Sequence, residues 1–237
     1  LFMVKSKKIF ECNNCGHQSS KWTGKCVECN EWNTLSERIL SSSKKNSVSK
    51  SLKTPQLIND IKGESSERIQ INDQEFNRVI GNGLVKGSVI LLGGEPGIGK
   101  STLSLKIALT LQLKVLYISG EESNEQIKLR AKRLNYQNNQ CFIYNETEIN
   151  TIIKTSDEVT PKLIIIDSIQ TIYNSEIDAI PGSVSQIKYS AEVLIKFAKE
   201  RSIPIIIIGH ITKDGAIADP KVLEHMVDTV LQFEGDK

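Results

Sequence analysis

The amino-acid sequence has no long hydrophobic segment. Its longest apolar runs, residues 163–166 and 203–208, have the length of single strands and fall far below the ~20 residues that cross a bilayer as a helix. The first residues also lack the order of basic, apolar and small residues that marks a secretory signal. We therefore expect a cytoplasmic protein with no membrane partner.

A strong net charge is also missing, because 30 basic residues nearly balance 28 acidic ones. The balance is uneven along the chain. Residues 1–55 hold ten Lys or Arg and four Glu, whereas residues 56–237 carry a small acidic excess. A basic arm beside a mildly acidic body is compatible with nucleic-acid binding, and equally with a solvated, lysine-rich tail. Charge alone leaves both interpretations open.

Cysteine is scarce, with five in the chain, yet four of them lie between positions 12 and 29. They form two Cys-x2-Cys pairs, which can offer four thiolates to a tetrahedral Zn²⁺ ion. Disulfides are disfavoured without a secretion signal, and a redox Cys-x2-Cys pair normally occurs once, near a βαβ unit. Four thiolates leave no open position for a substrate, so we predict a structural Zn²⁺ site. Its ligands are Cys12, Cys15, Cys26 and Cys29.

Composition divides the chain into three segments. Residues 1–35 contain the predicted zinc ribbon, residues 36–66 are a Ser-, Lys- and Asn-rich linker, and residues 67–237 alternate apolar runs with amphipathic stretches. Near-continuous apolar strands between helices are typical of an α/β fold, a mostly parallel sheet covered on both faces. We expect strands at 88–92, 114–119, 140–144, 162–167, 204–209 and 229–234, and helices at 100–111, 123–134 and 183–201.

A phosphate-binding loop follows the first of these strands. The sequence GEPGIGKS, residues 94–101, matches G-x4-G-K-[ST] between a strand and a helix, which is the context that this motif requires. The glycines let backbone N–H groups surround a phosphate, the lysine reaches the β- and γ-phosphates, and the serine ligates Mg²⁺. We therefore predict that ATP binds with Mg²⁺ to Gly94, Glu95, Pro96, Gly97, Ile98, Gly99, Lys100, Ser101 and Thr102.

Polar residues at three later strand ends complete the predicted site. Asp167 ends an apolar strand in the Walker B manner and is expected to join Ser101 around Mg²⁺. One of Glu121 and Glu122 is predicted to orient the attacking water, although both would also suit the start of the next helix. His210 is a candidate γ-phosphate sensor, or else a structural histidine.

These segments together resemble the RadA (Sms) family of bacterial DNA-repair ATPases. The stretch CNNCGHQSSKWTGKCVECNEWNT is similar to that family's zinc finger, and VIGNGLVKGSVILLGGEPGIGKST to its P-loop region. The segments YISGEES, IIIDSIQT, PGSVSQIK and LEHMVD resemble its later blocks, so the likeness covers nearly the whole chain.

The resemblance implies a RecA-like, DNA-dependent ATPase of recombinational repair. Such a protein would act on single-stranded or branched DNA as a homo-hexamer in its full-length form, promoting branch migration and strand exchange alongside the RecA recombinase. The resemblance supports Glu121 and Glu122 as the water-activating pair and places Thr212 and Lys213 in a loop directed toward DNA. Asp219 departs from the family's usual glycine, and a carboxylate there would weaken contacts with phosphates. The family's Lys-Asn-Arg-Phe-Gly motif and Lon-protease-like domain are absent from the 237 residues.

Two other functions fit parts of the sequence. An ATP-dependent protein-interaction switch of the circadian-clock ATPase type is compatible with GEES, but the zinc module and LEHMVD disfavour it. A truncated remnant that binds nucleotide without coupling it to DNA is the other alternative, although the P-loop and Asp167 leave the nucleotide site complete. Stimulation of ATP turnover by DNA would separate the DNA-dependent ATPase from both.

Overall fold

The computed structural model describes residues 7–40, 55, 57–60, 68–210 and 221–234. The chain divides into two compact units, Leu1–Glu67 and Arg68–Lys237. A short 3₁₀ turn, η1 (Ile58–Asp60), is the described element of the first unit nearest to this division.

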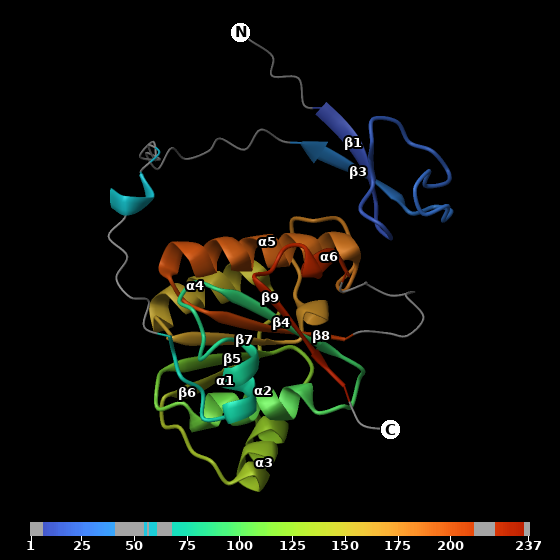
Figure 1. Ribbon diagram of the computed structural model, residues 1–237. Helices are drawn as coiled ribbons and strands as arrows, with labels where there is room; N and C mark the ends of the chain where they lie inside the picture. Colours follow the sequence, from blue (N-terminus) through green and yellow to red (C-terminus); the bar gives the residue numbers. More distant parts are fainter. Residues whose placement is uncertain (1–6, 41–54, 56, 61–67, 211–220, 235–237) are drawn as a thin grey trace. The chain divides into compact units, whose positions relative to one another are not determined.

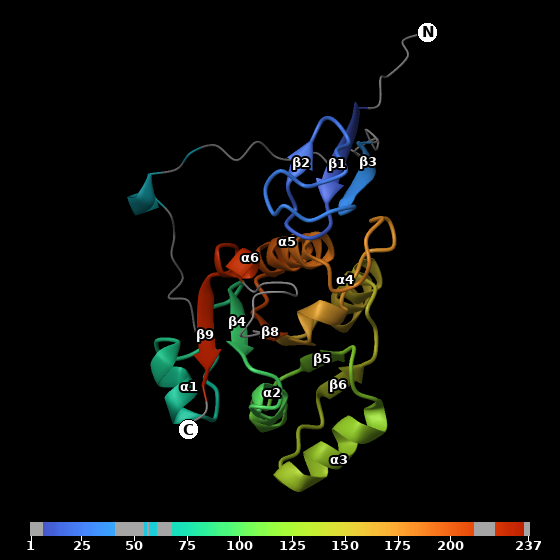
Figure 2. The same cartoon turned by 90° about the vertical axis from the view of Figure 1, so that its right-hand side faces the viewer.

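The first unit contains a three-stranded antiparallel sheet in the order β2-β1-β3 (Figure 2). Strand β1 (Lys7–Cys12) pairs with β2 (Gln18–Ser19) on one side and β3 (Leu35–Leu40) on the other. The prediction that the ribbon ends at residue 35 was therefore too short. The polar composition after that point suggested a linker, but backbone pairing with β1 continues the strand to Leu40. Most of the predicted linker lies outside the described residues.

A six-stranded parallel sheet forms the centre of the second unit, in the order β6-β5-β7-β8-β4-β9 (Figure 1). Its central strands are buried along almost their whole length, whereas the edge strands β6 and β9 alternate between half-buried and exposed residues. The mostly parallel α/β sheet predicted from the apolar runs is thus confirmed. The strands are β4 (Val89–Gly94), β5 (Val115–Ser119), β6 (Cys141–Tyr144), β7 (Leu163–Asp167), β8 (Ile205–His210) and β9 (Thr229–Phe233).

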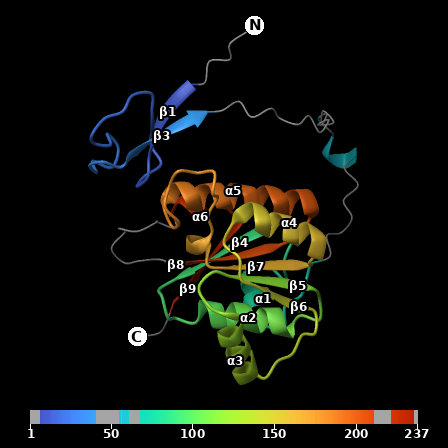
Figure 3. The ribbon, with the colours of Figure 1, turned by 180° about the vertical axis from the view of Figure 1, so that it is seen from behind.

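Helices cover both faces of this sheet (Figures 1 and 3). One face packs against α1 (Gln74–Val79), α2 (Lys100–Thr110) and α3 (Asn124–Leu134), and the other against α4 (Ile149–Val159), α5 (Val184–Arg201) and α6 (Lys221–Glu224). The sheet therefore separates two hydrophobic clusters. The three predicted helices are present within one residue of the expected bounds, while α1, α4 and α6 were not predicted.

The start of α3 shows how local sequence sets these bounds. The Ser123 side chain accepts a hydrogen bond from the backbone N–H of Gln126, and the Gln126 side chain accepts one from the backbone N–H of Ser123. This reciprocal capping box satisfies two N–H groups that a helix start leaves without partners. It fixes the end of the short loop that follows β5, and that loop carries Glu121 and Glu122.

Candidate functional site

The phosphate-binding loop joins the buried strand β4 to the first turn of α2. Gly97 and Gly99 have φ angles of +79° and +109°, a region that residues with a Cβ atom rarely adopt. Gly99 is the N-cap of α2, so the free N–H groups of that helix start lie at the loop. The glycine pattern of the sequence thus produces a turn with the geometry of an anion-binding site.

Lys100 points back into this loop. Its Nζ donates hydrogen bonds to the carbonyl oxygens of Gly94 and Glu95, at 2.7 and 2.8 Å, and the side chain is buried. Burial lowers the pKa of Lys100, while the carboxylates of Asp167 and Glu121 act in the opposite direction. The ammonium therefore lies between the loop carbonyls and the acidic groups of neighbouring strands. In the same loop Glu95 and Pro96 are exposed and Ile98 is half-buried, and Thr102 is exposed on the first turn of α2.

Asp167 and Ser101, 66 residues apart in the sequence, are brought together at the end of β7. The Ser101 hydroxyl donates to Asp167 Oδ1 at 3.0 Å, and the Tyr117 hydroxyl donates to Oδ2 at 2.5 Å. Burial raises the pKa of Asp167, and these two hydrogen bonds oppose that increase. Carboxylate and hydroxyl oxygens are ligands that Mg²⁺ prefers, so this pair fits the metal role predicted from the sequence.

The two adjacent glutamates have different surroundings. Glu121 Oε1 accepts a 2.6 Å hydrogen bond from the Ser168 hydroxyl and lies 3.4 Å from His210 Nε2. Glu122 instead forms an ion pair with Arg130 of α3. The hydrogen bond from His210 is the main factor that lowers the pKa of Glu121 to about 2, against the opposing effect of burial and with help from Ser168 and Lys100.

The parallel sheet explains why these residues meet. The carboxyl ends of parallel strands share one edge of the sheet, and ligand sites of α/β folds gather there. Ser119 pairs in register with Asp167, and Gly94 pairs with His210. The structure thus places five predicted residues in one region: Lys100, Ser101, Glu121, Asp167 and His210. Glu122 is next to it but turned to Arg130, while Thr212, Lys213 and Asp219 lie outside the described residues.

Sequence reasoning missed four polar residues around this site. Tyr117 is buried inside β5 and contacts Asp167, and Arg130 holds Glu122 from α3. Ser168 follows Asp167 directly, and Gln170 Nε2 donates to the His210 carbonyl oxygen at 3.5 Å. Nothing in the sequence marked Tyr117 or Arg130 as part of a site, since a tyrosine in an apolar strand and an arginine in a helix are common. Ser168 and Gln170 could have been found from their position just after the Walker B strand.

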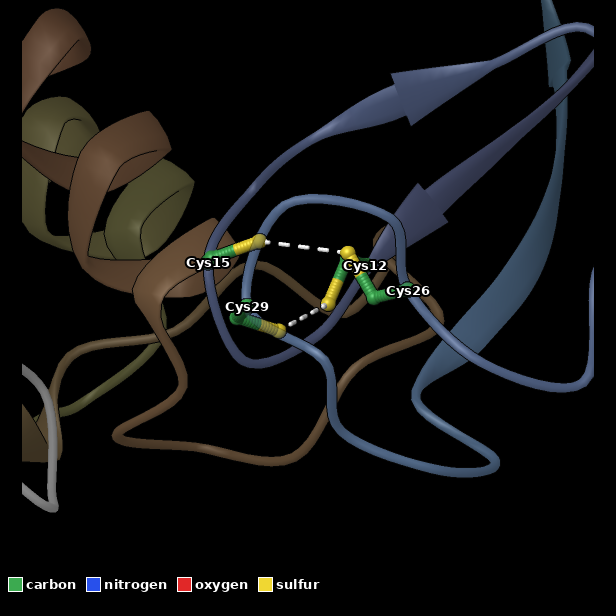
Figure 4. Close-up of side chains that lie close together, drawn as sticks. All are labelled: Cys12, Cys15, Cys26 and Cys29. Atoms are coloured by element: carbon green, nitrogen blue, oxygen red, sulfur yellow. Dashed lines mark hydrogen bonds between the residues drawn. The ribbon is translucent and has the colours of Figure 1, made fainter.

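The four clustered cysteines form a separate candidate site in the first unit (Figure 4). Cys12 Sγ lies 3.6 Å from Cys29 Sγ, and Cys15 Sγ lies 3.5 Å from Cys26 Sγ. All four sulfur atoms lie within 4.8 Å of one another. A tetrahedral ion with metal–sulfur distances of ~2.3 Å needs sulfurs ~3.8 Å apart, so the cluster fits a four-thiolate metal site.

The surroundings of Cys12 favour the thiolate form that binds metals. Burial raises the pKa of this thiol, but a hydrogen bond with Thr34 and backbone N–H groups outweigh it and lower the pKa to about 6. Each Cys-x2-Cys turn is closed by backbone bonds, from Gly16 N–H to the Cys12 carbonyl oxygen and from Asn30 N–H to the Cys26 carbonyl oxygen. All five cysteines of the chain are free of disulfides.

Comparisons with known proteins match both units. The family model described as "AAA domain" matches residues 60–216, and the one described as "Rubredoxin metal binding domain" matches residues 10–37. Among solved structures, a KaiC-like protein from Pyrococcus horikoshii aligns with a TM-score of 0.58 and 16% identity over 70% of this chain and 81% of that one. This likeness shows the fold alone. Within the described residues, no helix is long and apolar enough to cross a membrane.

Curated relatives align over nearly the whole sequence. The "DNA repair protein RadA" of Listeria monocytogenes is 48% identical over 99% of this chain and 53% of the relative. The proteins of the same description from Bacillus subtilis and Pseudomonas aeruginosa are 47% and 42% identical with the same coverage. The chain therefore spans about half the length of the curated relatives that it matches.

Proposed function

Because this chain belongs to the AAA-domain family of P-loop ATPases and is similar along its length to DNA repair protein RadA, we propose that it hydrolyses ATP in a DNA-dependent manner. The observation that supports ATP hydrolysis best is the convergence of Lys100, Ser101, Asp167 and Glu121 at one edge of the parallel sheet. No other group of residues in the described chain combines a phosphate loop with acidic residues in this way.

Each residue of the cluster has a separate task in this proposal. The backbone N–H groups of residues 94–102 other than Pro96, together with the Lys100 ammonium, hold the β- and γ-phosphates, and Ser101 with Asp167 would hold Mg²⁺, which supplies positive charge against the phosphate oxygens. Glu121 orients the attacking water and accepts its proton. We assign this role to Glu121 because its carboxylate faces Ser168 and His210, while Arg130 holds that of Glu122.

His210 is proposed to report the γ-phosphate. It ends β8, in register with Gly94 of the phosphate loop, and its ring contacts Glu121. A change in charge at the γ-phosphate would therefore reach the residues that directly follow β8. Thr212 and Lys213, the proposed DNA-contacting residues, belong to that following segment.

The metal of the four-cysteine site is proposed to be Zn²⁺ with a structural role. Four thiolates complete a tetrahedral shell, and among the side chains that the structure describes the hydrophobic cluster at the site has three buried members, Cys12, Cys26 and Leu35, two of which are themselves ligands. A ribbon with so small a core depends on its metal for folding. Metal analysis of the purified chain tests the identity of the ion, since rubredoxin-type sites of other proteins also take iron. One zinc per chain is expected, and iron in its place would overturn the assignment.

We further propose that the full-length protein acts in recombinational DNA repair. It would process single-stranded or branched DNA intermediates, promoting branch migration and strand exchange with the RecA recombinase as a cytoplasmic homo-hexamer. The similarity to DNA repair protein RadA supports this role. In this half of the protein, its modules would be the zinc ribbon, the segment that follows the ribbon, and the ATPase domain.

Steady-state ATP hydrolysis with and without single-stranded DNA tests the proposal. Stimulation by DNA is expected, and Lys100→Ala is expected to abolish turnover because it removes the charge that faces the phosphates. Lys199→Ala on α5 is a matched control, since Lys199 is exposed and lies outside the cluster. Turnover that Lys100→Ala abolishes but DNA does not affect would support the ATPase and contradict DNA dependence. Turnover that survives Lys100→Ala would contradict both.

A further inference from the structure

The two tryptophans of the chain both lie in the metal ribbon and are both largely exposed. Trp22 is 58% exposed and Trp32 is 69% exposed. Indole side chains are on average strongly buried, because they are the largest apolar groups available to a core. Here the ribbon core is built from Cys12, Cys26 and Leu35 instead. The ribbon therefore presents its two largest rings to solvent, and folding of the metal site does not explain them.

The two rings converge on one glycine. A Cβ atom placed on Gly24 would lie 3.6 Å from Cζ3 of Trp32 and 3.8 Å from Cη2 of Trp22. Both indoles thus lie next to Gly24. The Lys25 ammonium lies 5.8 Å from the centre of the Trp32 ring, within the range of a cation–π contact. The result is a compact surface with two rings and a positive charge.

The metal knuckle holds this surface in place. Lys25 and Trp32 face each other across an isolated antiparallel bridge, and Asn33 N–H donates to the Gly24 carbonyl oxygen at 2.8 Å. Cys26 N–H donates to the Glu31 carbonyl oxygen at 2.9 Å. These bonds close the loop that carries the second Cys-x2-Cys pair. The same turn that gathers the thiolates therefore sets the position of Trp32 next to Gly24.

The composition of the surface favours single-stranded nucleic acid over a protein partner. Protein interfaces bury a contiguous apolar centre that is depleted of charge. Here charged or polar residues adjoin the tryptophans: Lys21, Thr23 and Glu31 in the sequence, and Lys25 across the bridge to Trp32. Single strands need separate rings on which bases stack, together with nearby cations for the phosphates. The first unit also holds the excess of positive charge, with 11 basic and 7 acidic residues in positions 1–67 against 19 and 21 in positions 68–237.

We propose that Trp22 and Trp32 form a stacking surface for the bases of single-stranded nucleic acid, with Lys21 and Lys25 near the phosphates. The site would bind the strand without reading its sequence, because every base offers a flat face to an indole. It deepens the proposed function, on which it rests for the class of its ligand, while it lies outside the phosphate-loop unit and needs neither ATP nor its hydrolysis. DNA and RNA strands share the chemistry that it recognises.

Tryptophan fluorescence tests this site directly, because both tryptophans of the chain belong to it. The full 237-residue chain, with its metal and without nucleotide, is titrated with an oligothymidylate of about 20 residues at low salt. Stacking is expected to quench the emission, and added salt is expected to weaken binding. An oligouridylate of equal length should quench to a similar extent, and a blunt duplex should not, because its bases are already stacked.

Substitutions separate stacking from other binding. Trp22→Ala and Trp32→Ala should each weaken binding of a labelled oligothymidylate about 5- to 150-fold, as expected for loss of one base–ring stack. Trp32→Phe should restore most of the affinity. Val27→Ala is the matched control, since Val27 is 69% exposed in the same ribbon but has no ring. Zinc content confirms that each variant keeps its fold.

Three results would overturn the proposal. Binding without quenching, with wild-type affinity in the alanine variants, would place the strand elsewhere on the chain. Equal effects of Val27→Ala and the tryptophan variants would remove the role of the rings. Absence of oligonucleotide binding would leave a protein as the occupant of this surface. None of these results bears on ATP hydrolysis, which Lys100→Ala tests separately.

Discussion

Replacement of Glu121 or Glu122 by glutamine distinguishes two adjacent residues that the sequence treats alike. Glutamine keeps an oxygen that can accept the Ser168 hydrogen bond of 2.6 Å, but it removes the negative charge and the basicity. Loss of a positioned general base typically costs a factor of 10² to 10⁴, so Glu121→Gln should lower kcat by roughly 10²- to 10⁴-fold. Nucleotide affinity should change little, because Lys100 and Ser101 remain.

Glu122→Gln should instead lower stability and leave kcat nearly unchanged. It keeps an accepting oxygen but removes the charge that pairs with Arg130, whose Nη1 is buried with no hydrogen bond, so the free energy of unfolding should fall by about 1–3 kcal/mol. Its kcat should stay within a few-fold of wild type. Steady-state hydrolysis, fluorescent-nucleotide binding and urea denaturation of both variants separate the two effects. Equal losses of kcat, or a larger loss in Glu122→Gln, would refute the assignment of the base.

The pH dependence of Glu121 follows from the same contacts. Its pKa in the folded chain is about 2, below the ordinary value of 4.5. A carboxyl with a lowered pKa stabilises the fold fully above its unfolded pKa, and this contribution is lost as pH falls through the folded value. We therefore expect Glu121 to stabilise the fold fully above about pH 4.5 and to lose that effect toward pH 2. Comparison of acid unfolding in wild type and Glu121→Gln measures it, and parallel acid-unfolding curves would contradict it.

Three further predictions concern the supports of the two sites. Cys12→Ser should release the metal and unfold the ribbon without unfolding the second unit. Metal analysis and two-stage thermal melting would show these two effects. Retained zinc in the variant would exclude the four-cysteine site. Tyr117→Phe should lower the free energy of unfolding by about 1–3 kcal/mol, because the buried Asp167 Oδ2 loses its hydrogen-bond donor. The control Tyr136→Phe, at an exposed position, should change the free energy of unfolding by no more than about 0.5 kcal/mol. Equal urea midpoints for the two variants would count against the Tyr117 contact. Gly120→Ala should lower the free energy of unfolding by about 1–3 kcal/mol, since the added Cβ would lie 2.1 Å from Thr171 Oγ1. An unchanged melting temperature would contradict the close packing of Gly120 against Thr171.

The sequence predicted those elements whose causes are local. The apolar runs identified every strand of the large sheet, and the expected start of the second helix lies within one residue of the observed start of α3. Helix α4 was missed because Ile149, Ile152 and Ile153 cluster in its first half, only Val159 follows them, and the buried Ser156 is polar. Strand β3 was missed because pairing with β1, rather than side-chain pattern, defines it. A strand that is defined by pairing with a distant segment cannot be predicted from its own residues alone.

The residues of the candidate site also fall into those that the sequence alone predicts and those that depend on the fold. The phosphate loop is a contiguous motif and could be assigned from spacing, as could the Cys-x2-Cys pairs. The difference between Glu121 and Glu122 could not, because it arises from partners that the fold supplies. Ser168 lies 47 positions away from Glu121 and directly follows β7, and His210 lies 89 positions away at the end of β8. Strand order, which the sequence does not state, therefore decides which carboxylate contacts Ser168 and His210.

This dependence on strand order also explains how the proposed γ-phosphate sensor and the proposed base come to lie in one place. Strand β8 lies between β7 and β4 in the sheet, so its last residue is close both to the segment after Asp167 and to the phosphate loop. His210 contacts Glu121 through its ring, and its carbonyl oxygen accepts a hydrogen bond from Gln170. A shift of Glu121 toward a bound water would therefore disturb the end of β8 through the His210 ring. His210→Ala should accordingly weaken the response of ATP turnover to DNA more than it weakens ATP binding, and a variant that kept full DNA stimulation would show that the signal takes another route.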